Sequence, residues 1–129
     1  MEINKELLDK LFEQAKVNPR LRQNFDLRTS PADTSQRMLN ALLPGAVVPI
    51  HRHADTTETV ICLRGKLEEI IYEEEISDDG CISYQEIQRI HLCPTDNNHG
   101  CQVPKGAWHN VEVIEPSVIF EAKDGMYKP

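Results

Sequence analysis

The sequence predicts an all-β barrel or sandwich preceded by one N-terminal α-helix. One amphipathic segment covers residues 3–16, and strand-like runs separated by turn signals fill the chain from about residue 36 onward. Many short strands at regular spacing are typical of sandwiches and barrels rather than of parallel sheets. With 129 residues, the chain has the size of one domain that can bury one core.

Residues 3–16 have the spacing of an amphipathic helix. Apolar side chains recur every three or four positions from Ile3 to Ala15 and form one face. Asn4 can cap the helix, because its side-chain oxygen can accept from a free backbone N–H. Asn18-Pro19 ends the helix, because a residue before proline avoids the α region. We expect the helix to pack on the outside of a sheet or on a partner subunit.

The rest of the pattern predicts a series of short strands. They cover residues 36–43, 46–51, 57–63, 66–75, 81–91, 108–114 and 117–123. The turn signals between them include Pro44-Gly45, Arg64-Gly65, Asp79-Gly80, Lys105-Gly106 and Glu115-Pro116. Asp-Gly between two strand-like runs indicates a β-hairpin. We therefore divide the chain into a helix and arm over residues 1–35, which pack on the barrel, and a barrel over residues 36–129.

Charge and composition argue against two classes of function. The chain has 14 basic and 21 acidic residues and a net charge of -7, whereas nucleic-acid binding requires a basic face. No run approaches the ~20 apolar residues of a membrane helix, and no signal peptide is visible. We expect a cytoplasmic protein whose cysteines stay reduced, mostly as small buried side chains.

The stretch "PIHRHADTTE", residues 49–58, contains candidate metal ligands. Residues two apart on a strand point the same way, so His51 and His53 face one side together. Glu58 follows on the next strand, and His109 can join these residues only through the tertiary fold. Three imidazoles and one carboxylate suit one divalent ion such as Zn, Fe, Mn or Ni. Four protein ligands on an octahedral ion leave positions for water or substrate, unlike a closed structural zinc site.

These residues resemble the first motif of the cupin superfamily. The motif consists of a glycine, five residues, His-x-His, four residues, a glutamate, six residues and a second glycine. It is matched at every fixed position by Gly45, His51, His53, Glu58 and Gly65. The resemblance implies a cupin double-stranded β-helix, or jelly-roll, barrel.

The second cupin motif is met in part. Pro104-x-Gly106, two further residues and His109 are present. Gly100 stands closer to the proline than the leading glycine of the family usually does, and Val113 occupies the position of its trailing asparagine. Neither departure removes a metal ligand.

Residues 33–74 and the arm before them resemble the WbuC family of cupin-fold metalloproteins. That family is associated with bacterial O-antigen and surface-polysaccharide gene sets. The resemblance implies a metalloprotein that handles a sugar or sugar nucleotide. Because cupins tend to pair through sheet edges, we also expect a homodimer that involves the N-terminal helix or arm.

The strand pattern predicts which side chains face the pocket. If Glu58 points inward, Val60 and Cys62 share its face. By the same count His109 points inward and Trp108 outward. The metal would then lie near one mouth of the barrel, above an apolar floor.

Three polar residues are candidates for binding the substrate: Arg28, Arg37 and Asn40. A guanidinium group matches the geometry of carboxylate or phosphate, and a buried asparagine requires hydrogen-bond partners. The strand over residues 36–43 alternates imperfectly, so either the set that includes Arg37 or the set that includes Asn40 faces inward.

Two functions fit this site. The first is a metal-dependent enzyme, an isomerase or epimerase, a lyase or a dioxygenase, in which the ion polarises a carbonyl or holds an enediolate. The second is a metal-dependent sugar-binding module that catalyses nothing. A structural metal is a blander alternative. No residue stands out as a second acid or base. Tyr84, Glu86 and His91 are candidates, but the sequence does not place them near the metal site. The simplest interpretation of His91 and His99 is that they are solvated side chains.

Overall fold

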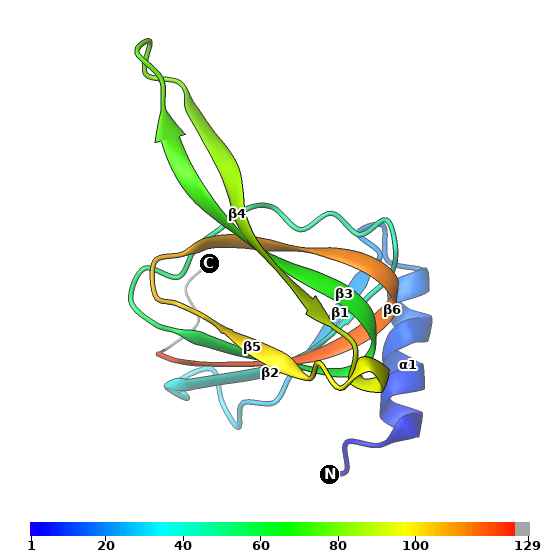
Figure 1. Ribbon diagram of the computed structural model, residues 1–129. Helices are drawn as coiled ribbons and strands as arrows, with labels where there is room; N and C mark the ends of the chain where they lie inside the picture. The colour runs from blue at the N-terminus through cyan, green and yellow to red at the C-terminus, as the bar shows by residue number, and fades with distance from the viewer. Residues whose placement is uncertain (126–129) are drawn as a thin grey trace.

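The computed structural model describes residues 1–125 and shows one α-helix and a two-layered antiparallel barrel (Figure 1). The elements are α1 (Lys5–Lys16), β1 (Arg22–Asp26), β2 (Ser35–Leu42), β3 (Glu58–Ile76), β4 (Ile82–Leu92), the 3-10 helix η1 (Pro94–Asp96), β5 (Gly100–Val103) and β6 (Trp108–Asp124). The strands follow the order β1-β2-β6-β3-β4, and β5 pairs with β3. The predicted all-β fold with one N-terminal helix is confirmed.

Two long strands, β3 and β6, bend and run through both layers. The first part of β3 pairs with β5 and the end of β6, and its second part pairs with β4 and the start of β6. At the bend Gly65 has a φ of +99°, and a Cβ there would collide with the carbonyl oxygen of Pro116. The signals at Arg64-Gly65 and Glu115-Pro116 therefore mark corners. The prediction of separate strands on either side of each corner was wrong, because pairing resumes after a shift of register.

The structure also differs from the prediction in three short segments. Residues 46–51 form a loop, in which His51 makes an isolated bridge to His109. Pro49 contributes to this difference, because it has no N–H for a ladder. Residues 22–26 and 100–103 form strands that were not predicted. Both are short, with five and four residues, and neither has an alternating apolar pattern that is long enough to predict a strand. Their neighbours stabilise them, since β1 pairs with β2 and β5 pairs with β3.

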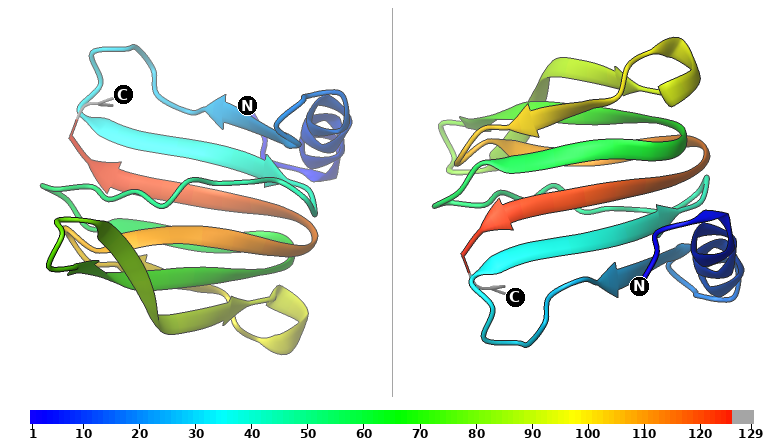
Figure 2. Two further views of the ribbon diagram at one scale, coloured as in Figure 1. Left: turned by 90° about the horizontal axis from the view of Figure 1, so that it is seen from above. Right: turned by 90° about the horizontal axis from the view of Figure 1, so that it is seen from below.

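Helix α1 packs on the outside of the sheet, beside β1 and β2 (Figure 2). Leu8, Leu11 and Ala15 are buried against Leu39 and other apolar side chains of β2 and β6. The predicted cap is present, since Asn4 Oδ1 accepts from the N–H of Leu7 over 3.1 Å. Among residues 1–125, no helix has the length and apolar character needed to cross a membrane.

A second core cluster fills the barrel interior. It contains Leu42, Val60, Cys62, Leu67, Leu92 and Ile119. Leu42 therefore faces inward, and Leu39 and Ala41 face the helix. This resolves the ambiguity in β2, because Asn40 shares the face of Leu42.

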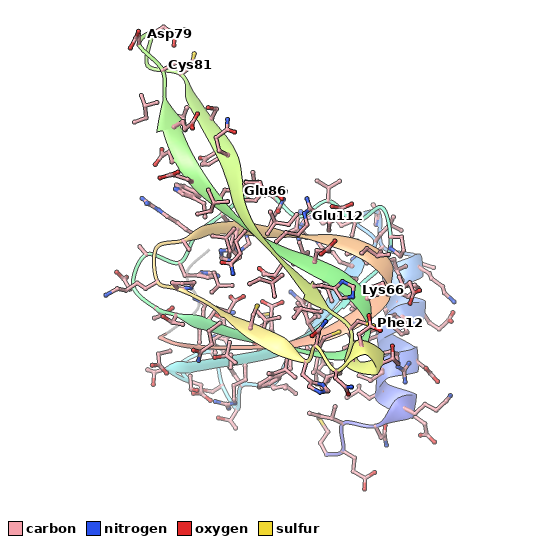
Figure 3. All side chains as sticks on the ribbon, in the orientation of Figure 1. Phe12, Lys66, Asp79, Cys81, Glu86 and Glu112 are labelled. Atoms are coloured by element: carbon pink, nitrogen blue, oxygen red, sulfur yellow. The ribbon has the colours of Figure 1, made fainter. Side chains whose placement is uncertain are left out.

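The hairpin β3–β4 extends well beyond the barrel, and Asp79 and Cys81 lie at its tip (Figure 3). The N–H of Ser77 donates to the carbonyl of Cys81 over 2.9 Å, and Gly80 has a φ of +84°. The hairpin predicted from Asp79-Gly80 is confirmed.

Candidate metal centre

His51 and His109 lie side by side because their backbones pair with each other. The N–H of His51 donates to the carbonyl of His109 over 3.0 Å, and the N–H of His109 donates to that of His51 over 2.8 Å. This bridge ties the loop between β2 and β3 to the start of β6. Two residues that are far apart in the sequence are thereby held at adjacent positions.

A tight turn over residues 104–107 holds His53 in place. The N–H of Ala107 donates to the carbonyl of Pro104 over 3.1 Å. Gly106 has a φ of +81°, which suits glycine at the third position of a type II turn. Its N–H donates to the carbonyl of His53 over 2.8 Å. The proline and glycine of the second motif thus fix the backbone next to the first motif.

The three imidazole rings converge on one point. The ring centroids of His51 and His109 are 4.2 Å apart. The ring centroid of His53 lies 5.3 Å from that of His51 and 5.4 Å from that of His109. One nitrogen from each ring lies within 4.8 Å of the others. The structure therefore brings together the three histidines that the sequence singles out.

Backbone carbonyls set the tautomer of two rings. His51 Nδ1 lies 2.9 Å from the carbonyl of Pro49, and His109 Nδ1 lies 2.9 Å from that of Ala107. A carbonyl only accepts, so each neutral ring carries its proton on Nδ1 and presents a lone pair at Nε2. Metal-binding histidines are usually oriented in this way.

Glu58, at the start of β3, lies next to the imidazoles. It is 5% exposed, and its Oε2 is 2.9 Å from His53 Nε2. Burial acts to raise the pKa of Glu58, but His53 and the nearby His109 outweigh it, and the pKa falls below its usual range. Burial lowers the pKa of His109. Both shifts favour a carboxylate beside a neutral imidazole, the protonation states that metal binding requires.

The donor set fits a divalent metal ion. Among the described residues, His53 Nε2 and His109 Nε2 are buried without a hydrogen-bond partner, and the approach of His53 to Glu58 lacks hydrogen-bond geometry. Such atoms are costly in a protein interior unless a further partner binds them. Three imidazole nitrogens and one carboxylate suit Zn, Fe, Mn or Ni.

A cavity of about 140 Å³ lies beside this cluster. His51, Glu58 and His109 line it, and its apolar lining consists of Leu42, Val48, Val111 and Ile119. Val60 and Cys62 are buried on the face of Glu58, as predicted. Burial raises the pKa of the Cys62 thiol to about 11. Cys62 belongs to the apolar core that includes Leu42 and Ile119, and it does not itself line the cavity.

Two carboxyl groups in the cavity were missed by sequence reasoning. Glu69 is 1% exposed, and its Oε2 has no hydrogen-bond partner among the described residues. Burial, followed by the charges of Glu58 and Glu121, raises the pKa of Glu69 to about 9. Burial and the charge of Glu58 raise the pKa of Glu121 to about 7. The signal for Glu69 was its position between Leu67 and Ile71, on the buried face of a strand.

The substrate candidates separate into two groups. Asn40 lines the cavity and donates to Glu121 Oε1 over 3.3 Å. Arg28 pairs with Asp26 at 2.7 Å, and Arg37 pairs with Asp33 at 3.0 Å. Neither arginine lines the cavity, because Arg28 lies beyond β1 and Arg37 belongs to the helix-facing set of β2.

Trp108 does not line the cavity, which agrees with the prediction that its side chain points outward. The Arg52 guanidinium lies 4.6 Å from its ring centroid, and the ring of Tyr84 lies 5.1 Å away. These contacts cover Trp108 on the outer face of the barrel.

A second group of possible ligands lies at the end of β4. Atoms of His91, Cys93 and Asp96 fall within 4.8 Å of one another. These atoms already have partners, since His91 Nε2 is 3.0 Å from Asp96 and the Cys93 thiol is 3.2 Å from the Thr95 hydroxyl. This group therefore lacks the unpartnered nitrogens that distinguish the histidine trio, and we assign no metal to it.

The comparisons with known proteins place the chain in a fold and match it to a family. A family model described as a domain of unknown function (DUF6016) matches residues 3–81. A search of curated proteins gave no match.

Solved structures with the same architecture are cupins. KdgF from Halomonas sp. is 18% identical with a TM-score of 0.60, and the match covers 86% of this chain and 85% of that one. A cupin-2 domain protein from Shewanella frigidimarina is 20% identical with a TM-score of 0.55, covering 87% and 88%. Oxalate oxidase, solved with glycolate, is 12% identical with a TM-score of 0.59, and the match covers 88% of this chain but 55% of that one. These likenesses confirm the cupin jelly-roll fold, while the WbuC resemblance stays a prediction.

Proposed function

We propose that this chain, which belongs to the family described as a domain of unknown function (DUF6016), is a metal-dependent enzyme acting on a sugar or a similar small polar metabolite. One juxtaposition carries the proposal. His109, whose Nε2 is unpartnered, and Glu69, whose Oε2 is unpartnered, line a single cavity together with His51 and Glu58. A structural metal needs only the first of these features, whereas proton transfer at a metal centre needs both.

The ligands of the metal in this proposal are His51, His53, Glu58 and His109. They would hold one divalent ion, with Zn, Fe, Mn and Ni as candidates. When bound, the ion supplies Lewis-acid polarisation of a substrate oxygen. The carbonyls that fix the Nδ1 protons keep two of the rings oriented toward it.

Glu69 is the proposed acid–base group. In the metal-free protein its raised pKa keeps the carboxyl protonated at neutral pH. A carboxyl group at this place can donate a proton to a substrate oxygen and take one back. Asn40 orients the neighbouring Glu121 carboxyl. A proton-handling group of this kind supports isomerase, epimerase or lyase chemistry more strongly than a dioxygenase reaction.

The cavity supports a small reacting group. Its volume of about 140 Å³ is close to the ~150 Å³ of an apolar cavity that accommodates benzene, so it suits one ring-sized moiety. We infer that the sugar part of a ligand enters it. The WbuC resemblance leads us to propose a sugar or sugar nucleotide of bacterial surface-polysaccharide metabolism, handled by a homodimer in the cytoplasm.

The test begins with metal content. Elemental analysis of protein purified without a metal-affinity tag should show near-stoichiometric metal in the wild type and strong loss in His51→Ala. His99→Ala is the matched control, since His99 is exposed and lies outside the cluster. Absence of metal from the wild type would overturn the proposal.

Proton transfer separates an enzyme from a non-catalytic binding module. Sugar nucleotides incubated with metal-loaded protein in D2O are screened by NMR for incorporation of deuterium. An enzyme of the proposed kind exchanges a carbon-bound proton, and Glu69→Gln should abolish this exchange while retaining metal. A ligand that binds at the cavity without exchange or turnover would support the binding module instead.

A further inference from the structure

A second pocket adjoins the metal cavity. It has a volume of about 310 Å³ and is lined by Asn18, Arg20, Arg22, Gln23, Asn24 and Asn40. Every one of these side chains is polar, and none is a carboxylate. Arg22 and Asn40 also line the metal cavity, so the two spaces are neighbours that share two lining residues. We refer to this space as the arm pocket.

The arm pocket contains two arginines without a carboxylate partner. Within residues 1–125, no carboxylate oxygen lies within 4.0 Å of the guanidinium group of Arg20 or Arg22. Four other arginines have such partners: Arg28, Arg37, Arg64 and Arg89. In a chain with a net charge of -7, two unpaired guanidinium groups at one pocket leave room for an external anion.

The backbone between these arginines adopts an uncommon conformation. Leu21 has a φ of +55°, in the left-handed region that a bulky side chain rarely enters. The N–H of Leu21 donates to the carbonyl of Asn18 over 2.9 Å, and its carbonyl accepts from the N–H of Leu43 over 3.0 Å. These bonds hold the short turn between α1 and β1, which carries Arg20 and Arg22 to the pocket.

We propose that the arm pocket binds a phosphate group of the ligand whose sugar part occupies the metal cavity. Each guanidinium group has five N–H donors, and the amides of Asn18 and Asn24 add further donors around the same space. A planar carboxylate is satisfied by one arginine in a bidentate pair, whereas a tetrahedral dianion can use donors from several directions. The inference rests on the proposed function, because it names the charged part of that substrate.

The test measures binding of three probes to the full chain by calorimetry. They are inorganic phosphate, a hexose 1-phosphate and the free hexose, with a nucleoside diphosphate hexose as a fourth arm that separates a monoester from a nucleotide. We expect the phosphorylated ligands to bind more tightly than the free hexose. Arg22→Gln should weaken their binding by at least tenfold, and Arg20→Gln should weaken it less, because Arg20 is exposed. Lys10→Gln, an exposed cation on α1, should have no effect.

Two further arms identify where the phosphate binds. His51→Ala should keep its affinity for inorganic phosphate, since the arm pocket does not include that residue. Loss of phosphate binding in His51→Ala would mean that phosphate binds the metal, and it would overturn the inference. Equal affinity of the wild type and Arg22→Gln would also overturn it, and would leave Arg22 as a counter-charge for Glu121. Both results concern the affinity for phosphate. The proposed function is tested separately by metal content, so the two can fail independently.

Discussion

Glu69→Gln should change how the stability of the metal-free protein depends on pH. The folded protein raises the pKa of this carboxyl to about 9 from an ordinary value of 4.5. Between these values the native state holds a proton that the unfolded chain releases, so the free energy of unfolding falls as pH rises. The side chain is 1% exposed, so solvent screens the effect little.

The size of the effect follows from the interval between the two pKa values. From about pH 5 to pH 8, an isolated group of this kind lowers the free energy of unfolding by about 4 kcal/mol, at 1.36 kcal/mol per pH unit. Glutamine has nearly the same shape and does not titrate. The two proteins should therefore differ little near pH 5, and Glu69→Gln should be the more stable by roughly 4 kcal/mol near pH 8.

Urea unfolding with a chelator present, followed at several pH values, measures this difference. The control is Glu74→Gln, because Glu74 is an exposed glutamate on the same strand. The free energy of unfolding of this variant should change with pH as that of the wild type does. Adding a divalent ion should reduce the slope of the wild type, because a nearby cation favours the ionised carboxylate. Parallel curves for the wild type and Glu69→Gln would refute a buried, protonated Glu69.

Four further outcomes are expected. His109→Ala should lower metal content strongly and Arg37→Ala should leave it unchanged by elemental analysis; loss of metal in the arginine variant would contradict the ligand set. Gly65→Ala should cost more stability than Gly80→Ala in denaturant unfolding, because both glycines have positive φ but only Gly65 faces a backbone carbonyl; equal costs would argue against the corner. Asn4→Ala should cost about 1 kcal/mol in the same assay through loss of the cap, and no change would contradict it. Light scattering should give a homodimer mass, and a monomer at all concentrations would reject pairing through the sheet edges.

Local signals identified most of the elements and the metal-ligand candidates. The apolar spacing of residues 3–16, the Asn4 cap and the Asp79-Gly80 turn all act within a few residues, and the structure shows each of them. The spacing of His51, His53 and Glu58 is also local, so the sequence identified them as one set of candidate ligands. His109 entered through its position after Pro104-x-Gly106, and the turn at those residues explains that spacing.

Long-range contacts decided the features that sequence reasoning missed or left open. The corner at Gly65 depends on the chain opposite it. The sequence at Arg64-Gly65 alone therefore could not show whether one strand bends there or two strands are separated by a turn. Strand β1 has one apolar side chain, Phe25, and it forms because β2 offers an edge with which to pair. The direction of Asn40 depended on which face of β2 the helix covers.

The sequence by itself determined the fold class, the helix and the candidate metal ligands, because caps, turns and alternation are short-range properties. Tertiary structure alone decided that Glu69 lines the same cavity as His51, Glu58 and His109. It also decided that Arg22 lines this cavity and that Arg20 lines the arm pocket, whereas Arg28 and Arg37 line neither. The sequence does not show whether a charged side chain forms an ion pair or a hydrogen bond in the folded protein. Its partners come from distant strands, and only the closed barrel shows which carboxyl and which guanidinium groups remain without one.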